Sequence, residues 1–221
     1  MEWTAFIDLE ELINLKRHQT IGDLVEANAG ADCIAINWRI FGGAGEEAYR
    51  PGLAMERFTR ASHIDFHPNR LIKSVIRTDR VVGLSHHHAL SSDAARIVAP
   101  DGALVDNRSE VEPCGSSFAV AQINHYFVRS RAEWALKVAR GYTDGTVRDP
   151  GLFDTYDRNE IEDRTILRRS RLTRRWMRQL RKPERFSWRS VGTRFMARTI
   201  RATCESIHHA LKIGARRARN E

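Results

Sequence analysis

The chain has 221 residues, 42% of them hydrophobic, and a formal net charge of +8. This length is sufficient for one domain with a hydrophobic core and an appendage. No apolar run approaches the roughly 20 residues that a membrane span needs, and no basic region followed by an apolar stretch marks a secretory signal. The three cysteines, Cys33, Cys114 and Cys204, are far apart and form no CxxC pair. This usage is typical of a reducing compartment, and we expect a cytoplasmic location.

The charge is distributed unevenly along the chain. Residues 164–221 contain 18 Lys and Arg against 3 Asp and Glu, whereas residues 1–163 contain 18 basic and 25 acidic residues. A mildly acidic body followed by a strongly basic tail differs from a uniformly basic protein. We therefore expect a domain at residues 1–163 and a separate basic tail at residues 164–221.

The apolar pattern predicts several strands and few, short helices. A buried strand is expected at residues 4–8, and Thr20, with Asp23 three residues later, marks the N-cap of a short helix that ends at residues 28–30. Further strands are expected at residues 33–41, 55–60, 71–77, 80–85, 102–106 and 118–127. This mixture predicts the α/β class, with a mixed sheet and flanking helices.

Two more helices are expected toward the end of the body. Ser130 and Glu133 have the spacing of a capping box, which predicts a helix that buries Trp134 and ends at Gly141. A second helix is expected to begin at Asn159. The loop at residues 42–45 is rich in glycine and is expected to be mobile.

The tail has two apolar stripes among its arginines. Leu172, Trp176 and Leu180 fall at helical spacing, and Pro183 ends that pattern. A second stripe runs through residues 196–211. The tail is therefore predicted to form two basic amphipathic helices.

Three carboxylates follow the first predicted strand. Asp8, Glu10 and Glu11 form an acid-x-acid pattern at its end. Such carboxylates can hold a divalent cation against a diphosphate, because hard cations prefer oxygen ligands. A solvated turn between two elements would have the same composition, and short acidic motifs often arise by chance.

The segment that contains these carboxylates resembles a motif of the glycosyltransferase family 2-like proteins, which include a group related to family 92. Residues 3–12, Trp-x-x-Phe-Ile-Asp-Leu-Glu-Glu-Leu, resemble the family's Trp-x-x-Phe-x-Asp-x-Asp-Glu-Phe. Further segments follow in the family's order: residues 37–42, 56–58, 73–77, 124–126, 130–141 and 157–163. The resemblance covers roughly residues 3–167, and the ordered set is more specific than any one motif.

The resemblance implies a GT-A fold and the transfer of a sugar from a nucleotide-sugar donor to a glycan or lipid-linked acceptor. It implies that Asp8 and Glu10 bind Mg²⁺ or Mn²⁺, which would neutralise the leaving diphosphate. His125 would be a third ligand or a diphosphate contact. An inverting transfer also needs a general base, for which the choice stays open among Asp157, Glu160, Asp163 and Glu56.

The chain departs from the family pattern in two ways. Glu10 stands where the family has a second Asp, and Leu12 stands where it has Phe. The family's nucleotide-binding strands precede this motif, so the resemblance implies the metal- and acceptor-side part of a GT-A domain. An alternative hypothesis is a non-catalytic remnant or binding module that docks through its tail.

The basic tail suggests a partner with negative charge. Trp176, Trp188 and Phe195 among arginines favour an anionic membrane, which would place the protein peripherally at the inner membrane face. Nucleic acid is supported by charge alone and is ranked last. The histidines at residues 86–88 are interpreted as a strand end rather than a zinc site, because consecutive strand residues face opposite ways.

Overall fold

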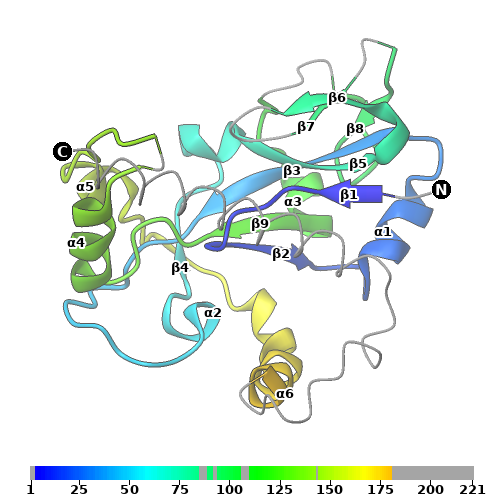
Figure 1. The fold of residues 1–221 in the computed structure, drawn as a ribbon. Coiled ribbons are helices and arrows are strands. Elements are labelled where there is room, and N and C mark those ends of the chain that lie inside the picture. The colour runs from blue at the N-terminus through cyan, green and yellow to red at the C-terminus, as the bar shows by residue number, and fades with distance from the viewer. Residues whose placement is uncertain (1–2, 85–88, 92–93, 106–109, 143, 181–221) are drawn as a thin grey trace, which may run out of the picture. The chain divides into compact units, whose positions relative to one another are not determined.

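The computed structural model of the protein describes residues 3–84, 89–91, 94–105, 110–142 and 144–180 (Figure 1). By its internal contacts the chain divides into a body, Met1–Ser170, and a second unit, Arg171–Glu221. The histidines at residues 86–88 and the second apolar stripe of the tail lie outside the described residues.

The body is built on a six-stranded mixed sheet. Five strands lie in the order β1 (Trp3–Ala5), β5 (Ile72–Arg77), β3 (Cys33–Ile40), β9 (Ala121–His125) and β2 (Glu11–Leu15). The sixth, β8 (Ile97–Val98), pairs with the start of β3. β3 runs parallel to β8 and β9 and antiparallel to β5, so the predicted mixed sheet is confirmed.

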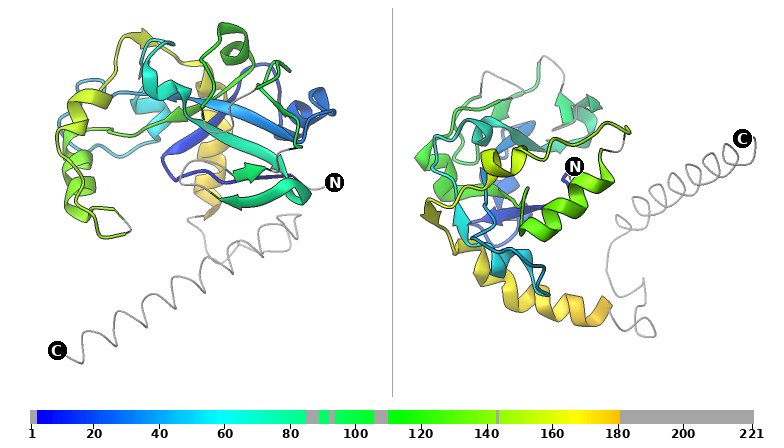
Figure 2. Two further views of the ribbon diagram at one scale, coloured as in Figure 1. Left: turned by 90° about the horizontal axis from the view of Figure 1, so that it is seen from above. Right: turned by 90° about the vertical axis from the view of Figure 1, so that its left-hand side faces the viewer.

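The sheet is curled, because its two outer strands are consecutive in the chain (Figures 1 and 2). The link between β1 and β2 is only the five residues 6–10. Lys73 of β5 contacts both Asp8 in this link and Glu11 at the start of β2. The link therefore lies over one face of the sheet and brings its carboxylates to the middle strands.

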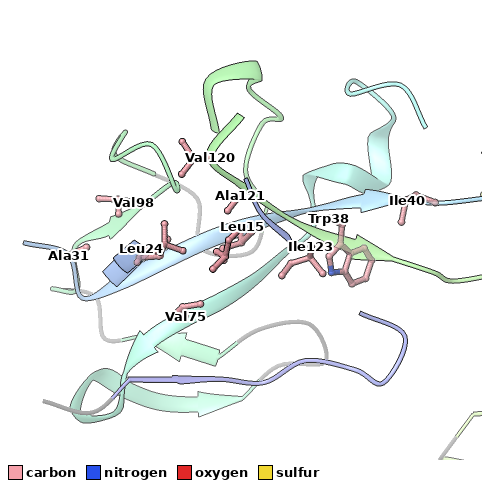
Figure 3. Packing of buried hydrophobic residues seen from close by; sticks show 12 residues of the cluster. Leu15, Leu24, Ala31, Trp38, Ile40, Val75, Val98, Val120, Ala121 and Ile123 are labelled. Carbon is pink, nitrogen blue, oxygen red and sulfur yellow. The ribbon is translucent and has the colours of Figure 1, made fainter. Parts of the chain in front are cut away.

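That face of the sheet carries the main hydrophobic core (Figure 3). Side chains alternate along a strand, so Ile34, Ile36 and Trp38 of β3 share one face. The register places Trp38 opposite Ile123 of β9 and Ile34 opposite Val75 of β5. All five are at most about 5% exposed and belong to one cluster.

The opposite face of β2 and β9 is polar and also buried. Asn14, Gln122 and Asn124 are each no more than 1% exposed. The Asn14 amide donates to Thr165 Oγ1 (2.8 Å), and that of Gln122 donates to Asp163 Oδ2 (2.9 Å). The side-chain nitrogens of Asn14 and Gln122 thus find acceptors, whereas Asn14 Oδ1 has no partner among the described residues. The two hydrogen bonds hold the segment after residue 162 against this face.

The remaining elements surround the sheet (Figures 1 and 2). The helices of the body are α1 (Ile21–Ala27), α2 (Ala54–Arg57), α3 (Gly115–Val120), α4 (Arg131–Arg140) and α5 (Leu152–Tyr156), with 3₁₀ turns η1 (His67–Arg70), η2 (Thr78–Arg80) and η3 (Thr165–Arg169). Two small antiparallel pairs complete it, β4 (Arg60–Ala61) with β10 (Ile161–Glu162), and β6 (Val81–Leu84) with β7 (Ala89–Ser91).

The capping signals predicted their helices correctly. Thr20 caps α1 and Ser130 caps α4, each in a reciprocal capping box with the residue three positions on. α4 ends at Gly141, whose φ of 71° is in the range that glycine tolerates best. Trp134 of α4 is buried as predicted.

Several predicted elements are wrong. The strand expected at residues 4–8 is the shorter β1, and a second strand, β2, follows the carboxylates without having been predicted. Residues 54–57 form helix α2, because Ala-Met-Glu-Arg are all strong helix formers. No helix begins at Asn159, since the next residues form β10 against β4. In the described part of residues 102–106 there is no strand, only an isolated bridge from Leu104 to Val98.

The second unit is described through α6 (Ser170–Leu180), which begins at the last residue of the body. Leu172, Trp176 and Leu180 lie at helical spacing in α6 and are exposed. Four arginines and no acidic residue lie in the same helix. None of the helices in the described ranges combines the length and apolarity needed to cross a bilayer.

Candidate functional site

The predicted metal carboxylate Asp8 is bound to a lysine from the middle of the sheet. Lys73 is only 4% exposed, and its Nζ lies 3.0 Å from Asp8 Oδ2 and 3.3 Å from Glu11 Oε2. Glu11 is buried as well, and its Oε2 accepts the backbone N–H of Asp8 (2.8 Å). Lys73 therefore sits between two carboxylates and fixes the link over the sheet.

Burial raises the pKa of Glu11, and the nearby charge of Asp8 adds to this, although the hydrogen bond from Asp8 and the charge of Lys73 act against it. The second oxygen of Glu11, Oε1, is buried and has no hydrogen-bond partner among the described residues. A buried carboxylate with one oxygen unsatisfied is costly to keep ionised. The charge of Lys73 therefore helps to keep the Glu11 carboxylate ionised.

Glu10 is bound to a different lysine. Lys137 of α4 forms an ion pair with Glu10 Oε1 and donates to the backbone carbonyl of Phe127 (2.8 Å). Its Nζ also lies 4.1 Å from the centroid of the Phe127 ring. Burial lowers the pKa of Lys137, and the charges of Arg148 and Arg129 add to this, while Glu10 opposes it. Asp8 and Glu10 thus lie in one short link but form ion pairs with different lysines.

His125 lies at the end of β9, opposite Glu11 in β2. It is only 4% exposed, and its ring packs edge-on against Trp38 (4.2 Å between centroids) and Phe127 (5.6 Å). The structure thus places His125 directly beside the carboxylate link. Trp38 itself packs in the main core.

Asp157 lies next to the glycine loop after β3. Its Oδ1 accepts the backbone N–H of Gly43 (2.6 Å) and the side-chain amide of Asn159 (2.7 Å). The neighbouring Tyr156 packs its ring on Phe127 (4.5 Å between centroids). Asp157 is therefore near the end of β9, where Phe127 and Lys137 also lie.

The loop at residues 42–45 is held in place, contrary to the expected mobility. The N–H groups of Gly42, Gly43 and Ala44 donate to Arg60 O (3.0 Å), Asp157 Oδ1 (2.6 Å) and Asn159 Oδ1 (2.9 Å). A Cβ on Gly43 would lie 2.2 Å from the backbone oxygen of Arg129. The glycine therefore permits a close approach of two chain segments.

Asp163 and Glu160 lie elsewhere. Asp163 contacts Gln122, whose side chain is on the opposite face of β9 from that of His125. Burial alone would raise the pKa of Asp163, but hydrogen bonds from Thr165 and Gln122 and the charge of Lys16 outweigh it and hold the pKa below its usual range. Glu160 forms an ion pair with Arg158 (3.5 Å). The structure brings neither of them to the carboxylate link.

The residues around the link do not fit a metal centre as they stand. Carboxylate oxygens suit Mg²⁺ and Mn²⁺, but Asp8 and Glu10 are each bound to a lysine. Within the part of the chain that the structure describes, no group of three or more His, Cys, Asp or Glu is arranged to hold a metal ion. We therefore derive no step through a metal.

The sequence did not single out the cations of this site. Lys73, Lys137 and Arg148 were missed as site residues, although the first two lie in segments that carry the family resemblance. Lys73 is the one charged residue in the strand Ile72–Arg77 that is buried. A lysine inside an apolar strand is a signal for a buried ion pair.

The site opens into a surface hollow of about 430 Å³. Three cations, Arg129, Lys137 and Arg140, line it together with Glu10 and Glu133.

Comparison with known proteins gives no match to this chain, whether to a family model, a curated protein or a solved structure.

Proposed function

We propose that this chain transfers a sugar from a nucleotide-sugar to a glycan or lipid-linked acceptor, as the glycosyltransferase family 2-like proteins that it resembles do. One observation carries the proposal. Segments of the resemblance that are far apart in sequence meet at the carboxylate link: Asp8 contacts Lys73, and Glu10 contacts Lys137. The Tyr126 N–H also donates to the Glu10 carbonyl (2.9 Å).

A second contact joins the acidic segment at residues 157–163 to the end of β3. The N–H of Gly43, which directly follows the segment at residues 37–42, donates to Asp157. Chance resemblance of isolated motifs gives no reason for them to converge in space. Their convergence supports a shared origin with a GT-A domain, whose curled mixed sheet with flanking helices this body would represent.

Asp157 is the best candidate for the general base. A base must reach the acceptor hydroxyl. Of the four acidic residues left open for this role, Asp157 is the one that contacts the glycine loop, and it directly follows Tyr156, which packs on Phe127. Its Oδ1 is fixed by two donors, which orients the carboxylate. The cations beside Glu10 would counter the charge of the leaving diphosphate. Because Asp8 and Glu10 are each bound to a lysine, these residues do not fit Mg²⁺ or Mn²⁺ as they stand, and the proposal assigns no step to a metal.

The test is the release of nucleoside diphosphate from UDP-glucose, UDP-galactose, UDP-N-acetylglucosamine and GDP-mannose, with Mn²⁺ and with EDTA. We expect release from at least one donor, and its loss in Asp157→Asn. Asp154→Asn is the matched control, because this carboxylate is three residues away and 79% exposed. No release from any donor, or equal rates in both variants, would contradict the proposal.

A second function is favoured by α6. Its exposed Leu172, Trp176 and Leu180 among four arginines have the composition of a helix that binds an anionic membrane surface. We propose that this helix docks the protein to anionic lipid, with or without catalysis. Sedimentation with phosphatidylserine vesicles at low salt should fall when Trp176 is changed to Gln, whereas Gln179→Ala should sediment as the unaltered chain does. Equal sedimentation of all three proteins would refute this function.

A further inference from the structure

Arg148 is a buried cation that has no anionic partner among the described residues. The residue is 6% exposed, and its Nε has no hydrogen-bond acceptor within the described residues. No carboxylate in that part of the chain forms an ion pair with it. Charged side chains are almost never buried unless they are paired.

Aromatic rings surround this guanidinium in place of an anion. Its carbon Cζ lies 3.8 Å from the ring centroid of Tyr142, 5.7 Å from that of Phe127 and 5.9 Å from that of Trp134. Such contacts hold a cation in place and are worth roughly 0.5–2 kcal/mol. They leave Nε without a hydrogen-bond acceptor among the described residues.

A second cation lies on the same ring. The Nζ of Lys137 is 4.1 Å from the Phe127 centroid, and the charges of Lys137 and Arg148 repel each other. Glu10 is the carboxylate that neutralises Lys137. Lys137 and Arg148 thus lie close enough to repel each other, and Glu10 is bound to only the first of them.

The adjoining hollow continues this excess of positive charge. Arg129 and Arg140 line it beside Lys137. Its other carboxylate, Glu133, is bound by Arg57 (2.8 Å) and lies 3.7 Å from Arg129. The three cations that line the hollow and the nearby Arg148 thus outnumber its two carboxylates, Glu10 and Glu133.

We propose that Lys137 and Arg148, with Arg129 and Arg140, form a binding site for a diphosphate group. A diphosphate supplies the missing negative charge, an arginine fork matches phosphate oxygens, and a lysine meets them as a point charge. The hollow also has an apolar rim, because Leu9 is 98% and Leu136 is 71% exposed. Both a nucleoside diphosphate and an isoprenoid-lipid diphosphate have this chemistry. The site does not depend on sugar transfer, since a module that only binds such a ligand would use the same cations.

The experiment is a calorimetric titration of the full chain with inorganic pyrophosphate in EDTA at low salt. We expect saturable binding that weakens at least about tenfold in Arg148→Leu, because charge-assisted hydrogen bonds are lost. Arg131→Gln is the matched control, because Arg131 also lies over a ring (Phe153, 4.3 Å) but is half-exposed and paired with Glu47 and Asp154. It should bind pyrophosphate as the unaltered chain does.

Thermal unfolding without ligand separates this site from a purely structural arginine. If Arg148 is kept for an anion, Arg148→Leu should unfold at the same or a higher temperature than the unaltered chain, because an unpaired buried charge has been removed. Absence of pyrophosphate binding by the unaltered chain, or a lower unfolding temperature in Arg148→Leu with unchanged binding, would overturn the proposal.

Competition then distinguishes the two sources of diphosphate. Displacement of pyrophosphate by UDP supports a nucleotide, and displacement by geranyl diphosphate supports a lipid carrier. Displacement by neither would overturn the assignment to an organic diphosphate. Pyrophosphate binding without nucleoside diphosphate release would leave this site standing and remove the transferase function.

Discussion

Replacing Lys73 by methionine will expose how strongly the carboxylate link depends on one buried cation. Lys73 is 4% exposed and contacts Asp8 (3.0 Å) and Glu11 (3.3 Å). Methionine fills similar space without the charge. The change leaves Glu11 as a buried carboxylate with only the Asp8 N–H as a partner for Oε2.

The expected loss is large for a single substitution. Breaking a buried pair by removing one partner costs about 3–5 kcal/mol, a large part of the 5–15 kcal/mol that typically separates folded from unfolded states. The double variant Lys73→Met/Glu11→Gln should recover about half of this loss or more, because the stranded charge is gone while the side-chain oxygen that accepts the Asp8 N–H is kept.

The pH dependence has a defined sign. Burial raises the pKa of Glu11 in the folded protein, so the folded state holds the proton more tightly than the unfolded state. The stability from this group is then present below its unfolded pKa and is lost as the pH rises through its folded pKa. Removing Lys73 raises that pKa further, so the deficit of Lys73→Met should shrink as the pH falls from neutral toward about 5.

The assay is urea unfolding of the three proteins, followed by tryptophan fluorescence at both pH values. Trp38 is buried in the main core and reports its loss. A change of less than about 0.5 kcal/mol in Lys73→Met, the size of an ordinary surface substitution, would refute the reasoning. If the loss of unfolding free energy in Lys73→Met grows as the pH falls, the explanation by a stranded Glu11 charge is wrong.

Three further substitutions test the surroundings of the site. Gly43→Ala places a Cβ 2.2 Å from the backbone oxygen of Arg129 and should lower the free energy of unfolding in urea by about 1–3 kcal/mol. Gly45→Ala is its control, because the new Cβ has open space around it and the variant shows only the cost of the left-handed backbone. Ser130→Ala removes the N-cap of α4 and should cost about 1 kcal/mol by the same measurement; no loss would mean that the capping box contributes nothing. Asn124→Leu leaves partners of a buried network unsatisfied and should cost about 1–3 kcal/mol, and a stabilised variant would contradict the network's role.

Local signals in the sequence were sufficient for some elements. The capping boxes at Thr20 and Ser130 are short-range and self-contained, so they predict α1 and α4 without knowledge of the rest. The apolar strand β3 lies in the middle of the sheet, where continuous hydrophobicity is expected. The other elements depend on pairing between residues that are far apart in the sequence. β2 was missed because its Glu-Leu-Ile-Asn-Leu has a buried polar face that exists only through contacts with β9 and residues 163–165.

The motif singles out the carboxylates of the candidate site but not its cations. Asp8, Glu10 and His125 are marked by a motif, and the structure places Asp8 and Glu10 in the link before β2 and His125 opposite Glu11 at the end of β9. Lys73 and Lys137 are distant in sequence, and only the curl of the sheet and the docking of α4 bring them to the link. Arg148 belongs to no motif, and its significance comes from burial without an anion.

The most direct test of the central claim is a calorimetric titration of the full chain with UDP, first in EDTA and then with Mn²⁺. We expect saturable UDP binding in EDTA that is weakened in Arg148→Leu and unchanged in Arg131→Gln. Stronger binding with Mn²⁺ that is lost in Asp8→Ala would add a metal site to this account. Absence of saturable UDP binding in both buffers would contradict the claim that this chain handles a nucleotide-sugar.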